Sequence, residues 1–178
     1  ESNVMNKRNL KFIIFPIIVV LLLGTIYAVI FSRWKDKTPA TYEQVWSVLE
    51  ENGYTPTDTT EHFINNWKEQ NTLKGVLNKA VTVQQDDIRF DYYMFDSKST
   101  ADYYRGLYIS YTRSNRYDVK NVEFSERLAN YTIYTIKAAG MYTAVVMVDN
   151  TLVFAYSDSE NSSVIYDMIV DIGYFDKD

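Results

Sequence analysis

The sequence contains no cysteine and a single histidine, His62. Without cysteine, the chain has no disulfide, no thiolate-bound metal and no cysteine nucleophile. A zinc site needs three or four His, Cys or carboxylate ligands. A Ser-His-acid triad needs a serine presented to its histidine, and no Gly-x-Ser-x-Gly motif occurs here. We therefore interpret His62 as a surface or half-buried helix residue.

Glycine and basic residues are also scarce. The six glycines are scattered singly, so the chain has neither a phosphate-binding loop nor a dinucleotide-binding fingerprint, and we expect no cofactor. Six of the 18 basic residues precede Thr38, which leaves 12 basic and 21 acidic residues, a net charge of −9, in the rest of the chain. So acidic a domain repels nucleic acid and anionic lipid headgroups, and we expect no nucleic-acid partner.

One stretch of the sequence lacks charge altogether. Residues 12–31 read FIIFPIIVVLLLGTIYAVIF. As a helix they measure roughly 30 Å, the thickness of the hydrocarbon core of a bilayer. A secretory leader has a shorter apolar region followed by small residues, whereas here the bulky Ile30-Phe31 pair precedes Arg33. We predict an uncleaved transmembrane helix at residues 12–31 that contacts membrane lipid; a cleaved leader and a buried core helix are the alternatives.

The two flanks of this segment carry equal numbers of basic residues: Lys7, Arg8 and Lys11 before it, and Arg33, Lys35 and Lys37 after it. The positive-inside rule therefore gives no preference, but the N-terminal tail is short, and large domains cross the membrane largely regardless of charge. We predict a single-pass protein of a bacterial-type cytoplasmic membrane with its C-terminal domain outside. A cytosolic domain localised by the anchor is the alternative.

The predicted chain has four parts. Residues 1–11 form a short tail, in which residues 1–4 are interpreted as a cloning remnant ahead of the natural start at Met5. The transmembrane helix follows, then a short linker at residues 32–40. Residues 41–178 form one α+β domain, the usual size for a single core.

Apolar spacing within this domain predicts about four helices and about five to six strands. The first helix opens with the capping-box residues Thr41 and Gln44, and the third is capped by Ser99. Residues 88–94 alternate as in a half-buried strand, and residues 141–148 are apolar on both faces, as in a central strand. We expect an antiparallel sheet that ends in a C-terminal meander and is packed by the helices.

Carboxylates are the remaining route to catalysis. Asp86 and Asp87 lie at one predicted turn, and Asp158 and Glu160 lie at another. Paired carboxylates can hydrolyse a glycoside or bind Ca²⁺, but neither group has the pattern of a Ca²⁺ loop. Acidic residues are also common at turns and helix starts. These four residues are therefore weak candidates for an acidic site, and we expect no metal.

Three arginines, Arg105, Arg113 and Arg116, fall on one flank of the third predicted helix. They are a candidate docking patch for an anionic partner, although a solvated helix face is the default interpretation. Our leading hypothesis is a small acidic interaction domain, without catalysis, that is an accessory, sensory or inhibitory partner of another envelope protein. A carboxylate-based envelope hydrolase is the competing hypothesis. A hydrolase should show a pocket with two perturbed carboxylates, and a binding domain an exposed apolar or aromatic patch.

Overall fold

The computed structural model describes residues 15–27, 35–114, 122–128 and 130–177. The chain divides into two compact units, residues 1–35 and residues 36–178. In the first unit, residues 15–27 are helical. None of the helices in the described ranges is long and apolar enough to cross a bilayer. Residues 12–14 and 28–31 of the expected span lie outside the described residues.

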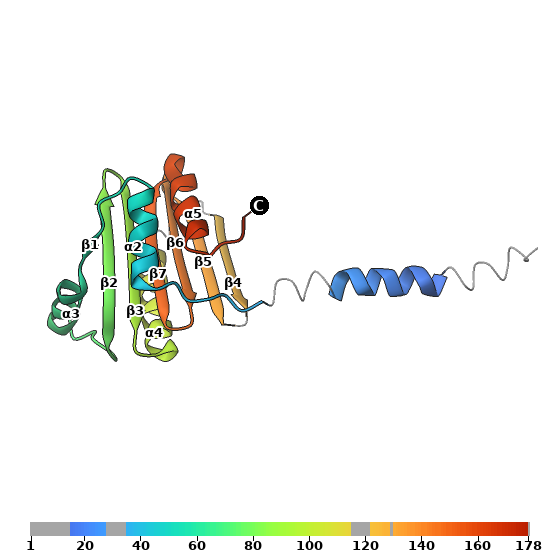
Figure 1. Ribbon diagram of the computed structural model, residues 1–178, viewed down its shortest axis with the longest axis horizontal. Coiled ribbons are helices and arrows are strands. Elements are labelled where there is room, and N and C mark those ends of the chain that lie inside the picture. Colours follow the sequence, from blue (N-terminus) through green and yellow to red (C-terminus); the bar gives the residue numbers. More distant parts are fainter. Residues whose placement is uncertain (1–14, 28–34, 115–121, 129, 178) are drawn as a thin grey trace, which may run out of the picture. The chain divides into compact units, whose positions relative to one another are not determined.

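The second unit has the predicted α+β fold with an antiparallel sheet (Figure 1). Its elements are α2 (Tyr42–Glu51), β1 (Thr57–Asp58), α3 (Thr60–Glu69), β2 (Leu77–Gln85), β3 (Ile88–Phe95), α4 (Lys98–Ser114), β4 (Val122–Leu128), β5 (Tyr131–Ala138), β6 (Met141–Val148), β7 (Thr151–Asp158), a 3₁₀ turn (Ser159–Asn161) and α5 (Ser162–Asp171). The strand order is β1-β2-β3-β7-β6-β5-β4, with β1 only two residues long. The C-terminal meander is confirmed, because β4 to β7 pair consecutively.

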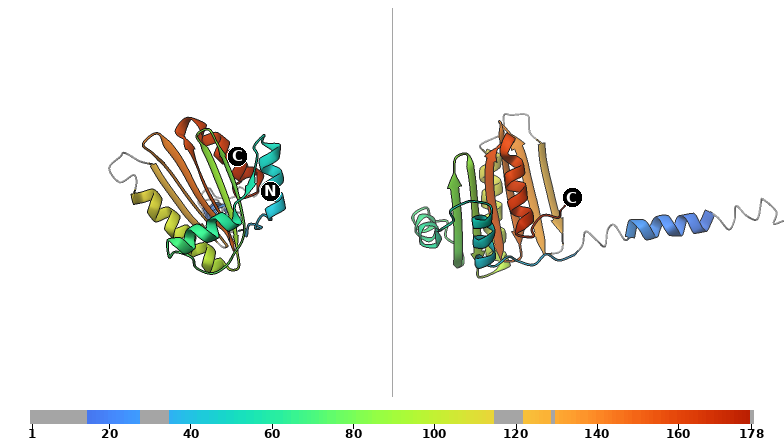
Figure 2. Two further views of the ribbon diagram at one scale, coloured as in Figure 1. Left: turned by 90° about the vertical axis from the view of Figure 1, so that its left-hand side faces the viewer. Right: turned by 45° about the horizontal axis from the view of Figure 1, so that its top comes forward.

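Helices cover both faces of the sheet, as Figure 2 shows, with α2 and α5 on one face and α3 and α4 on the other. Each face has its own buried cluster of apolar side chains. The prediction that β3 is half-buried is therefore wrong. Asp91 is 1% exposed and Tyr93 is fully buried on the face expected to meet solvent, because α3 and α4 cover that face. The prediction of a central strand at β6 is confirmed by its buried side chains.

Side-chain caps mark the starts of α2 and α4. Thr41 and Gln44 form the predicted reciprocal capping box at the start of α2. The cap of α4 differs from the prediction: the Ser97 hydroxyl, rather than that of Ser99, accepts the hydrogen bond from the Thr100 backbone N–H at 3.3 Å. Ser97 directly precedes the first helical residue, the position at which a side-chain oxygen reaches the free N–H groups.

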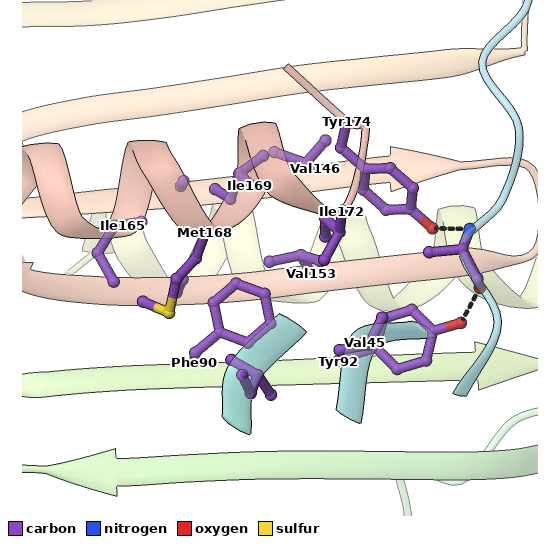
Figure 3. Close-up of a cluster of buried hydrophobic side chains, with 14 of the residues drawn as sticks. Val45, Phe90, Tyr92, Val146, Val153, Ile165, Met168, Ile169, Ile172 and Tyr174 are labelled. Atoms are coloured by element: carbon purple, nitrogen blue, oxygen red, sulfur yellow. Dashed lines mark hydrogen bonds between the residues drawn. The ribbon is translucent and has the colours of Figure 1, made fainter. Parts of the chain in front are cut away.

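Two tyrosines attach the entry of the chain to the second unit. The Tyr174 hydroxyl accepts a hydrogen bond from the Ala40 backbone N–H at 3.0 Å, and the Tyr92 hydroxyl donates one to the Ala40 carbonyl at 2.5 Å (Figure 3). Tyr174 also pairs with the Thr151 hydroxyl. Burial raises the pKa of Tyr174 to about 12, so its hydroxyl stays protonated at neutral pH. The backbone at Ala40 therefore belongs to the packed core.

We predict that Tyr174→Phe lowers the free energy of unfolding by about 1–3 kcal/mol, because the buried N–H of Ala40 loses its acceptor. Urea unfolding measures this change. The matched control is Tyr166→Phe, which removes a hydroxyl that donates to an exposed carbonyl of Asp176 and should change stability by no more than about 0.5 kcal/mol. Equal effects of the two changes would contradict the structural role given to Tyr174.

Candidate functional site

The fold brings Asp87 against the turn that contains Asp158 and Glu160, but in a structural arrangement. The Asp87 carboxylate accepts hydrogen bonds from the Asp158 backbone N–H at 3.0 Å and from the Asn161 side-chain amide at 3.0 Å. These bonds lower the pKa of Asp87 below its usual value, and the bond from Asn161 has the largest effect. Asp158 contributes its backbone to this contact, and Glu160 lies in the adjoining 3₁₀ turn. Within the described ranges, no group of three or more His, Cys, Asp or Glu residues could hold a metal ion.

Arg105 and Arg113 lie along α4 with separate contacts. Arg105 pairs with Asp102, one helical turn away, at 2.9 Å. The Arg113 guanidinium lies 5.4 Å from the centre of the Tyr134 ring. Arg116 lies outside the described residues. His62 is exposed on α3, in edge contact with the Phe63 ring.

A cleft lies between α3 and α4, and none of the described candidate residues above lines it. Its volume is about 430 Å³, and its floor is formed by β3 and β7. Arg89 pairs with Tyr156 across these strands, and Asp91 pairs with Phe154, so all four side chains lie on the same face of the sheet. Six of the lining residues are aromatic besides Tyr111 at the rim: Phe63, Trp67, Tyr104, Tyr108, Phe154 and Tyr156. The cleft is therefore an aromatic site with a small polar floor.

The polar floor centres on an ion pair. The Arg89 Nε donates to Asp91 Oδ2 at 2.7 Å, and the Thr82 hydroxyl donates to Asp91 Oδ1 at 2.7 Å. Burial lowers the pKa of Arg89, but the hydrogen bond and the charge of Asp91 outweigh burial and raise it overall, so Arg89 is a permanent cation. Its terminal nitrogens make no hydrogen bond within the described part of the chain, and its side chain is 30% exposed. Arg89 thus has free donors at the cleft.

The aromatic wall beside this pair is tightly held. The Tyr108 ring stacks on Phe154 with the ring centres 4.4 Å apart, and its hydroxyl lies 2.6 Å from that of Tyr93. Burial raises the pKa of both tyrosines, so both hydroxyls remain protonated at neutral pH. Trp67 stacks on Tyr104 at 4.1 Å from the opposite side, which joins α3 to α4.

A second hollow of about 320 Å³ continues the cleft along α4. Tyr111, Phe154 and Tyr156 line both hollows, so the two are contiguous. Thr143 on β6 lines the second hollow and pairs across the strands with Tyr156. Its hydroxyl is buried and has no hydrogen-bond partner among the described residues. A buried hydroxyl in this state is uncommon and costs stability.

Sequence reasoning missed the cleft because it assigned Arg89 and Asp91 to a solvent-facing side of β3. One signal was present: Tyr93 continues the Arg89-Asp91 face, and a large aromatic on a polar face indicates that something covers it. No sequence signal distinguishes Thr143 from the other threonines, because its environment depends on three elements distant in the chain.

No family model matches this chain, and no curated protein or solved structure is significantly similar to it.

The Arg89–Asp91 pair gives a test of the site. Arg89→Met should lower the free energy of unfolding by about 3 kcal/mol, the low end of the range for breaking a buried pair, because Asp91, whose pKa burial already raises, loses its cation while Arg89 itself is partly exposed. The double change Arg89→Met with Asp91→Leu should come within about 1 kcal/mol of wild type, since no charge remains buried and Thr82 still pairs with Thr59. Urea unfolding of the two variants measures the difference; a double variant less stable than the single one would contradict the arrangement.

Proposed function

We propose that this is a single-pass membrane protein whose α+β domain lies outside the membrane and binds, without catalysis, another component of the envelope. It is an accessory, sensory or inhibitory partner of another envelope protein. The observation that carries this proposal is the aromatic cleft between α3 and α4, with Leu107 and Tyr111 exposed at its rim. Exposed aromatic and apolar side chains that gather around a concavity are typical of binding sites.

The carboxylates favour binding over hydrolysis. Glycoside hydrolysis needs two carboxyl groups facing one bond. Among the described residues that line the cleft, Asp91 is the one carboxylate, and both of its oxygens accept hydrogen bonds from protein groups. Asp87 is likewise held by Asn161 and by the backbone of Asp158. Neither residue is placed as an acid or base toward an open site.

The membrane anchor is proposed at residues 12–31. Its support is the run of twenty residues without charge, long enough as a helix to span a bilayer core of roughly 30 Å. Residues 15–27 also expose large apolar side chains in succession: Phe15, Ile17, Ile18, Val19, Val20, Leu21, Leu22, Leu23, Ile26 and Tyr27. A helix that is apolar on all sides is typical of a buried or membrane setting.

The chain enters the domain at one end of the strands that form the cleft floor. The Lys37 backbone N–H donates to the side-chain oxygen of Asn130 at 2.9 Å, and the Asn130 amide donates to the Lys37 carbonyl at 2.7 Å. The chain thus enters beside the turns that precede β5 and β7. The Arg89–Tyr156 pair lies five residues along the strands from the Met94–Thr151 pair at that end, roughly 17 Å away. The Arg89–Tyr156 end of the cleft therefore lies away from the turns beside which the chain enters the domain.

The first test of this proposal concerns the orientation of the chain in the membrane. Protease added to intact cells or spheroplasts should digest the chain beyond residue 35, while a membrane-protected fragment that contains residues 12–31 remains. Carbonate washing should leave the full chain with the membranes, because a spanning helix is not removed by disrupting charge contacts. Full protection in intact cells, or a soluble form beginning after Ser32, would contradict the proposed location.

The cleft gives the second test. Leu107→Ser with Tyr111→Ser should abolish in-membrane crosslinking to the partner protein, because it removes the exposed apolar rim. The matched control is Phe124→Ser, which changes a similarly exposed apolar residue on β4 and should leave crosslinking unchanged. Quantitative mass spectrometry of the crosslinked proteins identifies the partner by its loss in the first variant. Equal partner recovery from all three proteins would overturn the cleft as the recognition site.

A further inference from the structure

We propose that the cleft binds a neutral saccharide about two sugar rings long, which lies across Tyr156 between Arg89 and Thr143. This inference rests on the proposed function in one respect: it takes the cleft as the recognition site of the domain. It goes further by naming the chemistry of the occupant, and it gives the domain a sensory input.

The spacing of the polar groups sets the length of the ligand. Arg89, Tyr156 and Thr143 form one cross-strand row over β3, β7 and β6. Adjacent strands are about 4.8 Å apart, so the first and last residues of the row are separated by roughly 10 Å. The two hollows contain the two ends of this row, and both are lined by Tyr156. A ligand that reaches both ends spans two six-membered rings.

The polar groups at the two ends can form hydrogen bonds with the hydroxyl groups of a ligand. Arg89 has free N–H donors, because only its Nε is bonded to Asp91 among the described residues. Thr143 has a buried hydroxyl, 1% exposed as a residue, without a partner in the described part of the protein. A sugar hydroxyl can accept from Arg89 and can either accept from or donate to Thr143. Binding would therefore satisfy a polar group that is otherwise buried alone.

The charge of the site favours a neutral ligand. Asp91 lies 2.7 Å from the Arg89 Nε, so the pair presents hydrogen-bond donors with little net charge. The chain beyond Lys37 carries a net charge of −9, which repels anions. Together these features disfavour a carboxylate, a phosphate or an acidic sugar.

The aromatic residues suit a sugar ring. One face of a pyranose carries C–H groups and is apolar, while hydroxyls lie around its edge. Tyr111 and Tyr156 line the cleft and are exposed and half-buried, respectively, so their surfaces are available for such a face. Tyr111 is 63% exposed, so the cleft stays open to water, where the outward hydroxyls of a saccharide remain solvated.

Two other ligand classes fit less well. A wholly apolar ligand would remove water from the Arg89 donors and give them no partner in return. A peptide needs partners for a backbone donor and acceptor at each residue. The floor of this cleft is the face of a sheet, not an edge, so it offers side chains rather than a row of backbone groups.

The test is calorimetric titration of the full chain in phospholipid nanodiscs, because alkyl glycoside detergents would themselves compete. The probes are maltose, cellobiose, lactose and N,N′-diacetylchitobiose, with glucose, a uronic-acid-containing disaccharide and the tripeptide Gly-Tyr-Gly as comparisons. We expect at least one neutral disaccharide to bind with a Kd of about 1 mM or tighter, and the three comparison probes to bind more weakly.

A matched pair of variants separates ligand contact from stability. Thr143→Val removes the hydroxyl but keeps the side-chain shape, and should weaken disaccharide binding by at least about tenfold. Thr132→Val is the control, because the Thr132 hydroxyl on β5 is also buried without a partner among the described residues, yet it lines neither hollow. It should leave the affinity within about twofold. Both variants should melt at or above the wild-type temperature, since each loses an unsatisfied buried hydroxyl.

Three results would overturn the inference: no binding of any of the four disaccharides to the folded wild type at about 10 mM, wild-type affinity in Thr143→Val, or tighter binding of the acidic disaccharide or the tripeptide. If disaccharides fail while Leu107→Ser with Tyr111→Ser still abolishes partner crosslinking, the proposed function stands and the saccharide inference fails. If disaccharides bind as expected while that double variant crosslinks normally, the saccharide site stands and the partner surface lies elsewhere.

Discussion

The pairing of β3 with β7 is the contact on which the rest of the domain depends. Residues 89–94 of β3 pair with residues 151–156 of β7 and so join the first three strands to the C-terminal meander. This pairing forms the floor of the cleft, since Arg89 and Asp91 come from one strand and Phe154 and Tyr156 from the other. It also places Tyr92 of β3 near Tyr174, and these residues together hold the backbone of Ala40.

The ion pair in the cleft is unusual because the sheet is covered on both faces. A strand covered on both faces is most stable with apolar side chains, and a buried ion pair rarely adds stability over an apolar replacement. Asp91 and Arg89 nevertheless lie on the covered face of β3, supported by the Thr82 hydroxyl. Thr143 adds an unsatisfied hydroxyl on the same face, among the described residues. The ion pair and the Thr143 hydroxyl lie at the cleft, whereas the buried Thr132 hydroxyl, also without a partner among the described residues, lies away from it. Departures from the local rules at a concavity are the pattern expected of a functional site.

The candidate residues taken from the sequence and the cleft found in the structure differ for a physical reason. Asp86, Asp87, Asp158 and Glu160 attract notice because acidic residues cluster in the sequence, but turns and helix starts use such residues for hydrogen bonds, as Asp87 does with Asn161. The arginines of α4 share a helix, but Arg105 is bonded to Asp102 within that helix. In contrast, Arg89 and Thr143 are far apart in the chain, and strand order alone places them in one cross-strand row.

The sequence by itself determined what depends on neighbouring residues: the α+β class, the capping box at Thr41, the meander of β4 to β7 and the apolar central strand β6. These features arise from hydrogen bonds and periodicities that extend over a few residues. Only the tertiary structure decided that β7 lies beside β3, that helices cover the polar-looking face of β3, and that a cleft forms there. Strand order and the covering of a face result from packing between elements distant in sequence, which local periodicity does not encode.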